Sequence, residues 1–178
     1  MIKTILVATD ASKHGKKAVK ISSELARSLK ARLVIVHTLL FDAHSSSLRK
    51  IASRQGLTRD QRHLLDSYEI DTQLTLAAAG GLDSSMTFVP PPVELLEPIG
   101  RQILEQAQGV ARESGVKNVS TKLMSGSPSE SILAAAKKEK ADLLVMGTRG
   151  YGELKGLFLG SVSHKVSAQA HCPVLTVK

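Results

Sequence analysis

The residues best suited to chemistry form a glycine-serine segment in the last third of the chain. The segment runs from Gly147 to Gly160 and continues into Ser161 and Ser163. Glycine lets the backbone approach a ligand closely, and the first N–H groups of a helix that opens at Ser161 form a ready anion site. The two serines add hydroxyl donors. The segment therefore predicts phosphate binding. The alternative is that its glycines only punctuate a loop.

Two predicted strands end beside polar residues. Residues 141–147 (ADLLVMG) form an apolar strand that stops where the glycine segment starts, and residues 3–9 (KTILVAT) form a strand that is followed by Asp10. In doubly wound sheets, ligands lie beyond the carboxyl ends of the strands. A carboxylate such as Asp10 at such an end suits ribose hydroxyls; the alternative is a plain helix-capping aspartate.

The spacing of these glycines resembles the nucleotide-binding signature of the ATP-binding universal stress proteins. It reads Gly147-x-x-Gly150, nine residues, then Gly160-Ser161. Four flanking segments are similar to that family too: Asp10-Ala11-Ser12, Val36-His37-Thr38, Gly126-Ser127-Pro128 and Cys172-Pro173-Val174. The resemblance covers about residues 1–41 and 93–178. It implies a Rossmann-like, adenine nucleotide alpha hydrolase-like fold.

The resemblance also implies a role for each matched residue. Ala8, Thr9 and Asp10 line the end of the first strand, with Asp10 at the ribose. Thr38 contacts adenine through its backbone, and Met146 and Gly147 pack beside the base or sugar. The phosphates are held by Arg149, Gly150, Gly160, Ser161, Val162 and Ser163. The implied ligand is ATP, ADP or AMP, with Mg²⁺ or Mn²⁺ bridging phosphates. The implied partner is a second copy, paired through an edge strand at 174–177.

An alternation of apolar strands and amphipathic helices is expected to position these residues. The predicted strands cover 3–9, 32–39, 117–124, 141–147 and 173–177, and the predicted helices cover 13–30, 93–114, 128–139 and 161–171. Ser12 is expected to N-cap the first helix. Ser127 and Glu130 are expected to form a capping box around Pro128. This order predicts an α/β fold with an open, doubly wound, parallel five-stranded sheet and helices on both faces.

The alternation breaks between residues 42 and 91, which we interpret as an insertion into a single domain spanning 1–178. Residues 48–55 and 59–68 have weak helical periodicity, the latter with a Thr58/Gln61 capping box. A loop of this length without structure is unusual in a compact domain. We therefore expect part of the insertion to be helical.

Other candidate residues favour structural interpretations. His37 ends an apolar strand and is expected to be a hydrogen-bonded core histidine; a catalytic role is the alternative. His164 and His171 share a predicted helix but have no third metal ligand beside them. Cys172 is expected to be a small packed residue and not a redox sensor. Residues 80–85 (GGLDSS) resemble the SGGxDS pyrophosphate loop of ATP pyrophosphatases. Ala79 replaces the leading serine, and a proline triplet soon follows where the helix should run, so we expect an insertion turn.

Composition limits the classes of partner and compartment. The chain has 178 residues and a formal net charge of +8, but only 3% aromatic residues, so it is poor in the stacking platforms that bind single strands. We expect neither a nucleic-acid partner nor a membrane span, because no stretch approaches about 20 apolar residues. The basic run at 13–20 is expected to be a solvated helix face. The single cysteine fits a reducing, cytoplasmic setting.

Three functions follow as hypotheses. The first is a nucleotide-dependent binding or signalling module for adenine nucleotides in the stress response. The second is a slow ATPase or adenylate hydrolase, in which Arg149, Ser161 and Ser163 stabilise phosphoryl charge; no Walker-A lysine pattern is present, and no acid–base pair is evident near the loop. The third is a nucleotide-independent interaction protein that docks through the insertion.

Overall fold

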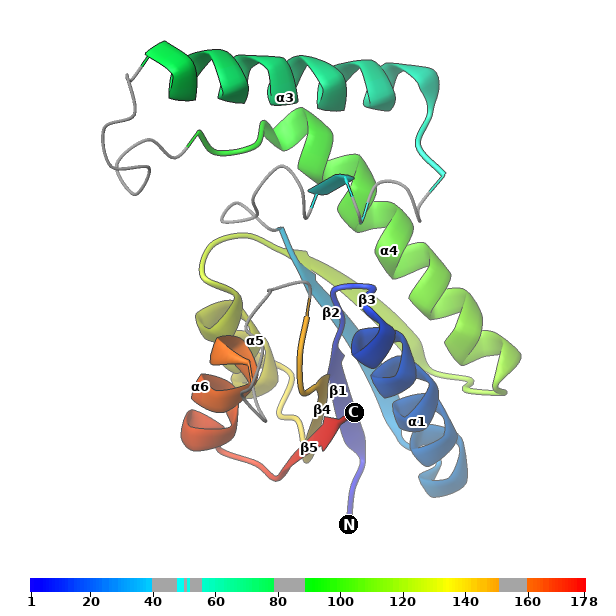
Figure 1. Ribbon diagram of the computed structural model, residues 1–178. Coiled ribbons are helices and arrows are strands. Elements are labelled where there is room, and N and C mark those ends of the chain that lie inside the picture. The colour runs from blue at the N-terminus through cyan, green and yellow to red at the C-terminus, as the bar shows by residue number, and fades with distance from the viewer. Residues whose placement is uncertain (40–47, 50, 52–55, 79–88, 151–159) are drawn as a thin grey trace. The chain divides into compact units, whose positions relative to one another are not determined.

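Figure 1 shows the computed structural model of the chain, which describes residues 1–39, 48–49, 51, 56–78, 89–150 and 160–178. The chain divides into two compact units. One contains Met1–Leu39 and Gly100–Lys178, and the other contains Leu40–Ile99. The expected insertion at 42–91 lies within the second unit.

The first unit is built on a parallel sheet. Its strands are β1 (Thr4–Ala8), β2 (Arg32–Thr38), β3 (Val119–Met124), β4 (Leu143–Gly147) and β5 (Val174–Val177). They pair in the order β3-β2-β1-β4-β5, and every pair is parallel. This confirms the predicted five-stranded α/β fold. The strand predicted at 117–124 forms one edge of the sheet as β3, and the last strand forms the opposite edge.

Helices cover both faces of this sheet (Figure 1). On one face, α1 (Lys13–Leu29) and residues from Gly100 onward of α4 (Val93–Glu113) bury a cluster that includes Ile5, Leu33 and Val145. On the other face, α5 (Pro128–Lys138) and α6 (Ser161–Gln169) bury Leu6, Val34 and Leu144. The central strands are apolar on both sides because each face packs on helices, as is usual for parallel sheets.

Capping explains where several helices begin and end. Ser12 has extended backbone angles and accepts the Gly15 N–H at 3.1 Å, which confirms the predicted N-cap of α1. After α4, Gly115 has φ +86°, a left-handed conformation that glycine adopts without strain.

The capping box predicted at the start of α5 is wrong. Pro128 is the first residue of the helix and Ser127 is its N-cap, as expected, but the Ser127 side chain makes no capping hydrogen bond. Its hydroxyl lies 3.3 Å from that of Ser129. Glu130 instead forms an ion pair with Lys165 of α6 at 3.0 Å. A partner 35 residues away in sequence has replaced the local contact.

The second unit contains α3 (Arg59–Ala78), which runs ten residues beyond the helix expected at 59–68. Its capping box is confirmed: the Thr58 N–H donates to Gln61 Oε1 at 2.9 Å, and the Gln61 N–H donates to Thr58 Oγ1 at 3.3 Å. Residues 52–55 of the helix expected at 48–55 lie outside the described residues.

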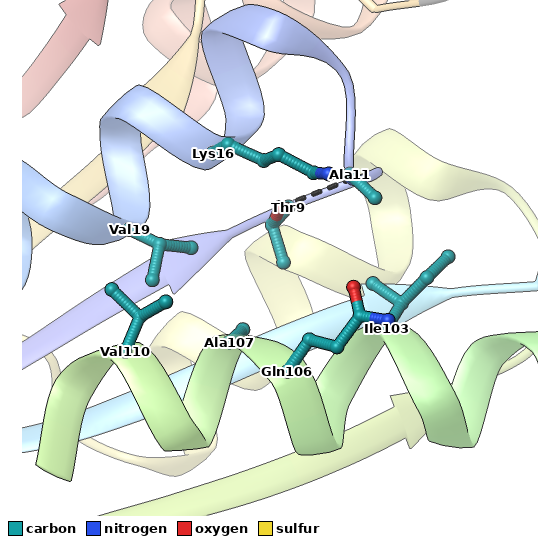
Figure 2. A pocket seen from close by; sticks show the side chains of 8 residues that line it. All are labelled: Thr9, Ala11, Lys16, Val19, Ile103, Gln106, Ala107 and Val110. Atoms are coloured by element: carbon teal, nitrogen blue, oxygen red, sulfur yellow. Dashed lines mark hydrogen bonds between the residues drawn. The ribbon is translucent and has the colours of Figure 1, made fainter. Parts of the chain in front are cut away.

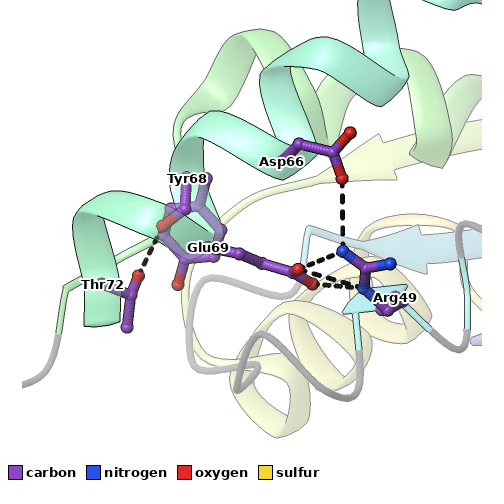
Figure 3. A network of polar contacts seen from close by, with 5 residues as sticks. All are labelled: Arg49, Asp66, Tyr68, Glu69 and Thr72. Carbon is purple, nitrogen blue, oxygen red and sulfur yellow. Dashed lines mark hydrogen bonds and ion pairs between the residues drawn. The ribbon is translucent and has the colours of Figure 1, made fainter. Parts of the chain in front are cut away.

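A polar network holds parts of the second unit together (Figure 3). Arg49 forms ion pairs with Glu69 and, at 3.2 Å, with Asp66, both of α3. Tyr68 is buried and donates its hydroxyl proton to the Val89 carbonyl at 2.8 Å. Burial raises the pKa of Tyr68. These contacts tie α3 to the segments before and after it in sequence.

Within the described part of the chain, none of the helices is both long and apolar enough to cross a bilayer.

Candidate nucleotide site

The carboxyl ends of β1 and β4 lie side by side at the centre of the sheet. Ala8 pairs with Met146 at the last step of the parallel ladder. The residues that follow each strand therefore leave the sheet at the same edge. The chain runs from β1 to β2 on one side and returns through β4 on the other, so this is the switch point where doubly wound sheets bind ligands.

The loop after β1 is fixed by its own side chains. Asp10 Oδ1 accepts the Ser12 N–H at 2.9 Å, and Thr9 Oγ1 accepts the Ala11 N–H at 3.2 Å. Ala11 has φ +64°, a left-handed conformation that is uncommon for residues other than glycine. The two side-chain hydrogen bonds hold this turn and thereby set the direction of the Asp10 carboxylate.

Two glycines enclose that carboxylate. A Cβ built on Gly15 would lie 2.6 Å from Asp10 Oδ1, and one built on Gly150 would overlap Asp10 Oδ2. Asp10 thus lies between the first turn of α1 and the loop that follows β4. The structure brings the residue expected at the ribose next to the residues expected at the phosphates.

Thr148 joins the end of β4 to the start of α6. Its N–H donates to the Val177 carbonyl at 2.8 Å, and its carbonyl accepts the Gly160 N–H at 2.8 Å. The Ser163 hydroxyl lies 2.9 Å from both the Thr148 and Gly160 carbonyls. These contacts fix the start of α6 at the carboxyl edge of the sheet, although residues 151–159 between them lie outside the described residues.

The start of α6 has the properties of an anion site. Gly160 is its N-cap, with extended backbone angles and no side-chain capping hydrogen bond. The N–H groups of Ser161, Val162 and Ser163 begin the helix at the positive end of its dipole. The Ser161 side chain is exposed, whereas Ser163 is 2% exposed and its hydroxyl proton is directed at backbone carbonyls. What Ser163 can offer an anion is therefore its backbone N–H.

The β2 side of the edge carries an unpaired hydroxyl. The Val36 carbonyl accepts the Thr9 N–H, and the Leu39 N–H donates to β3. Because backbone groups alternate between neighbours along a parallel strand, those of Thr38 face the end of β1. Thr38 is 6% exposed, and its Oγ1 has no hydrogen-bond partner among the described residues. A buried hydroxyl without a partner costs about 1–3 kcal/mol.

Ala8 and Met146 lie within the strands, beneath the loops that carry most of the other expected site residues. Both are at least nine-tenths buried, and both belong to the apolar cluster under α5 and α6. Gly147 and Arg149 continue from Met146 to the loop, where Arg149 is exposed. Met146 and Ala8 can therefore form only the floor of a ligand site.

His37 is a hydrogen-bonded core histidine, as expected. It is 3% exposed, and its Nδ1 lies 2.8 Å from the Thr9 carbonyl, so Nδ1 carries the proton and donates it. Burial lowers the pKa of His37, against smaller opposing effects of this hydrogen bond and the Asp10 charge. The ring is therefore neutral at neutral pH, and its hydrogen bond to Thr9 holds the start of the loop after β1.

The remaining candidates carry less chemistry. Among the residues that the structure describes, no three His, Cys, Asp or Glu side chains gather as metal ligands. Cys172 is a free, partly buried thiol whose pKa is raised mainly by burial and further by the Asp142 charge, which disfavours the reactive thiolate. The GGLDSS segment at 80–85 lies outside the described residues.

A small apolar pocket lies behind the β1 loop, between α1 and α4 (Figure 2). Its volume is about 160 Å³, and its lining includes Thr9 and Ala11 from the loop, Val19 from α1 and Ala107 from α4. In Figure 2 the Lys16 side chain extends along the pocket toward Ala11. Small side chains on both helices leave this space open.

Two residues of this region lie outside the predicted site. His14 belongs to the basic run that is expected to be a solvated face, but it is half-buried, and its Nδ1 lies 3.0 Å from Thr148 Oγ1. Thr148 is 3% exposed and occupies one of the unspecified positions between Gly147 and Gly150. A hydroxyl residue directly after Gly147 was the sequence feature that could have indicated Thr148 as a site residue. No sequence feature separates His14 from the lysines of the basic run.

The fold defines a doubly wound, parallel α/β protein, and comparison with known proteins gives the family. A sequence profile of the universal stress protein family matches residues 1–178. A universal stress protein of Thermus aquaticus is 36% identical over 186 residues, covering 100% of both chains. The chain therefore belongs to the universal stress protein family.

Solved structures show the same fold. A universal stress protein crystallised in complex with cAMP has a TM-score of 0.59 and 22% identity, covering 99% of this chain and 96% of its own. A universal stress protein from Archaeoglobus fulgidus in complex with dAMP has a TM-score of 0.59 and 19% identity, covering 100% of both. The fold is the Rossmann-like, adenine nucleotide alpha hydrolase-like fold, and some proteins that share it bind adenine nucleotides.

Proposed function

We propose that this protein binds an adenine nucleotide, with ATP as the principal ligand, at the carboxyl edge of β1, β2 and β4. It acts as a nucleotide-dependent binding or signalling module in the stress response. The observation that carries the proposal is the start of α6, whose first-turn N–H groups have no side-chain cap. A phosphate would accept hydrogen bonds from those groups and favour the positive end of the helix dipole.

The unpaired Thr38 hydroxyl supports the same ligand from the other end of the site. It lies at the end of β2, where the family resemblance expects the adenine ring. Most buried polar side chains in proteins are hydrogen-bonded. A polar ligand edge beside Thr38 would supply the missing partner and recover the free energy that its burial costs.

The proposed contacts divide the site into three parts. Thr38 contacts the adenine, above a floor made by Ala8 and Met146. Asp10 accepts hydrogen bonds from the ribose hydroxyls, with Thr9 and Gly147 beside the sugar. The phosphates are held by Arg149, Gly150, Gly160, Ser161, Val162 and Ser163.

We propose that a metal ion enters only with the nucleotide. Asp10 is a carboxylate at this edge, and its Oδ1 already accepts the Ser12 N–H. A Mg²⁺ ion usually keeps several waters and binds through one or two carboxylates and substrate phosphates. Mg²⁺ or Mn²⁺ would therefore bridge phosphates of ATP and would not bind the protein tightly by itself.

Binding, and not hydrolysis, is the proposed activity. His37 donates to the Thr9 carbonyl and His14 contacts Thr148, so both of these histidines are already engaged within the protein.

The test measures ATP affinity by titration calorimetry for the native chain and for Gly160→Ala. Among the described residues beyond its chain neighbours, the atom nearest to a Cβ at Gly160 would be the Thr148 carbonyl oxygen at 3.4 Å, so these residues leave room for the methyl group. A phosphate seated against this backbone would meet it. We expect a roughly 5- to 150-fold loss of affinity, since adding one methyl group to a tight contact costs about 1–3 kcal/mol. Lack of ATP binding by the native chain, with no adenine nucleotide found by mass spectrometry after denaturation, would contradict the proposal.

We also propose a homodimer that forms through β5. This strand ends the sheet, and it exposes Leu175. An edge strand presents unpaired backbone groups that a second copy can pair. Light scattering should give twice the chain mass of 19.0 kDa, and a monomer would contradict this part alone. We place the protein in the cytoplasm, where its free Cys172 would remain reduced.

A further inference from the structure

We propose that His14 is a positioning residue for the phosphate half of the nucleotide site, and that it acts through Thr148. This inference rests on the proposed function and assigns a role to a residue outside the family signature. His14 is the second residue of α1, and its Nδ1 lies 3.0 Å from Thr148 Oγ1.

The first turn of α1 and the end of β4 are in backbone contact. A Cβ built on Gly147 would lie 2.9 Å from His14 Cβ and 3.0 Å from the His14 carbonyl carbon. No side chain or water can lie between the two segments at this point. The His14 ring therefore leaves α1 directly beside Thr148, and its direction is set by this close packing.

Thr148 in turn fixes the start of α6 through its backbone hydrogen bonds. Its carbonyl accepts the Gly160 N–H at 2.8 Å and faces the Ser163 hydroxyl at 2.9 Å, and its N–H is bound to β5. The backbone of Thr148 is thus held by β5 and α6, while its side chain is held by α1. A change in the orientation of Thr148 would move the N-cap of α6, which is where a phosphate would bind.

Two side-chain hydrogen bonds connect the start of α1 with residues 148–149. One is His14 to Thr148 at 3.0 Å. The other runs from Ser12 Oγ to the Arg149 carbonyl at 3.4 Å, near the limit for a hydrogen bond. Ser12 also caps α1. The His14 contact is therefore the stronger link between the half of the site that holds Asp10 and the half that would hold phosphates.

His14 differs from the lysines around it. Lys13, Lys16 and Lys17 are exposed, and they can contribute only a general positive potential near the loop. His14 is half-buried and makes a specific contact. Replacement of Lys17 by glutamine is therefore a matched control, because it removes a full charge from the same helix turn without touching Thr148.

Loss of the His14 contact is expected to weaken binding of the phosphates and to leave binding of the nucleoside unchanged. A net hydrogen bond contributes about 0.5–1.5 kcal/mol, so the ATP dissociation constant should rise roughly two- to tenfold. The residues around Thr148 would have to be ordered at the moment of binding, and the affinity would fall by that cost. Adenosine, which has no phosphate, should bind as before.

The experiment compares ATP and adenosine affinities of the native chain, His14→Phe, His14→Asn and Lys17→Gln. Phenylalanine keeps the ring but has no nitrogen, whereas asparagine places an amide oxygen or nitrogen near the position of Nδ1. We expect a two- to tenfold loss for ATP in His14→Phe only, with recovery in His14→Asn and less than a twofold change in Lys17→Gln. Thermal unfolding without nucleotide verifies that each variant is folded.

A double-mutant cycle isolates the contact itself. Thr148→Val removes the hydroxyl and keeps the shape, so it should reproduce the loss in His14→Phe, and the double variant should be no weaker than either. Equal losses for ATP and adenosine, or fully additive losses in the double variant, would overturn the inference while ATP binding by the native chain stands. A native chain that binds no ATP would overturn the proposed function, and this inference with it.

Discussion

The glycines of the segment from Gly147 to Gly160 have different roles. Replacing Gly147 or Gly160 by alanine should show which of them is needed for stability and which for nucleotide affinity. At Gly147, an added Cβ would meet His14 Cβ at 2.9 Å, the His14 carbonyl carbon at 3.0 Å and the Gly15 nitrogen at 3.1 Å. At Gly160, the nearest atoms of the described residues would lie at 3.4, 3.8 and 3.9 Å, which are ordinary contacts. Gly147→Ala should therefore destabilise the protein, and Gly160→Ala should not.

The size of the Gly147→Ala effect follows from these contacts. Two of the three close atoms are backbone of α1, so β4 and α1 must move apart by several tenths of an ångström. Overpacking of this kind costs about 1–3 kcal/mol, and the smaller entropy of the unfolded alanine chain offsets about 0.4–1 kcal/mol. A net loss of about 1–2 kcal/mol should lower Tm by roughly 2–8 °C in a chain of this length.

For Gly160→Ala, two small effects oppose each other. Alanine lowers the conformational entropy of the unfolded chain, which stabilises the folded state, but it is a poorer N-cap residue than glycine. Gly160 has φ −74°, which alanine adopts without strain. The unfolding free energy should change by less than about 0.5 kcal/mol.

Urea and thermal unfolding followed by circular dichroism would measure stability, and calorimetry with ATP would measure affinity. Gly147→Ala should lose stability, and Gly160→Ala should lose affinity at unchanged stability. Equal stability of the two variants would show that the β4–α1 contact is not crowded at Gly147. Unchanged ATP affinity in Gly160→Ala would refute close approach of a phosphate to this backbone.

Three further predictions concern the neighbourhood of the site. Thr38→Val removes a buried hydroxyl without a partner, so the unliganded protein should gain about 1 kcal/mol in chemical unfolding, while ATP affinity falls. Because the pKa of His37 is lowered in the folded state, the unfolded chain takes up a proton at this residue at higher pH than the folded chain does, so the free energy of unfolding should fall as pH drops below about 6.5. His37→Asn should reduce the slope of the unfolding free energy against pH by up to about 1.4 kcal/mol per pH unit. An unchanged slope would contradict this prediction. Ala107→Leu should fill part of the 160 Å³ pocket and raise the unfolding free energy by about 1 kcal/mol, whereas a fall would mean that α1 and α4 cannot accept the larger side chain.

The sequence predicted the fold well because each signal was local and strong. Apolar runs identified the strands, and the residues around Ser12 and Thr58 identified helix starts whose capping hydrogen bonds the structure contains. The failure at Ser127 has the opposite cause. Glu130 satisfies a capping pattern, but its carboxylate finds Lys165 on α6, and a tertiary partner overrides a local preference worth only about 1 kcal/mol.

The sequence could predict the strand ends and the helix start that form the candidate site, but not the side-chain contacts between them. Strand ends and the helix start at Gly160 can be read from apolar periodicity, so the gathering of Asp10 and Gly150 at one edge was expected. The His14–Thr148 contact joins residues 134 apart in sequence. It depends on the close packing of α1 on β4, which no local pattern in the basic run at 13–20 encodes.

The pattern of satisfied and unsatisfied groups at this edge argues for a ligand. Asp10 in the loop after β1 and His37 near the end of β2 each have a hydrogen bond within the protein. Among the described residues at this edge, the groups without such a contact include the Thr38 hydroxyl at the end of β2 and the uncapped first turn of α6. Natural sequences tend to break local rules at functional sites. A nucleotide would pair these two groups at once, with a base beside Thr38 and a phosphate at α6.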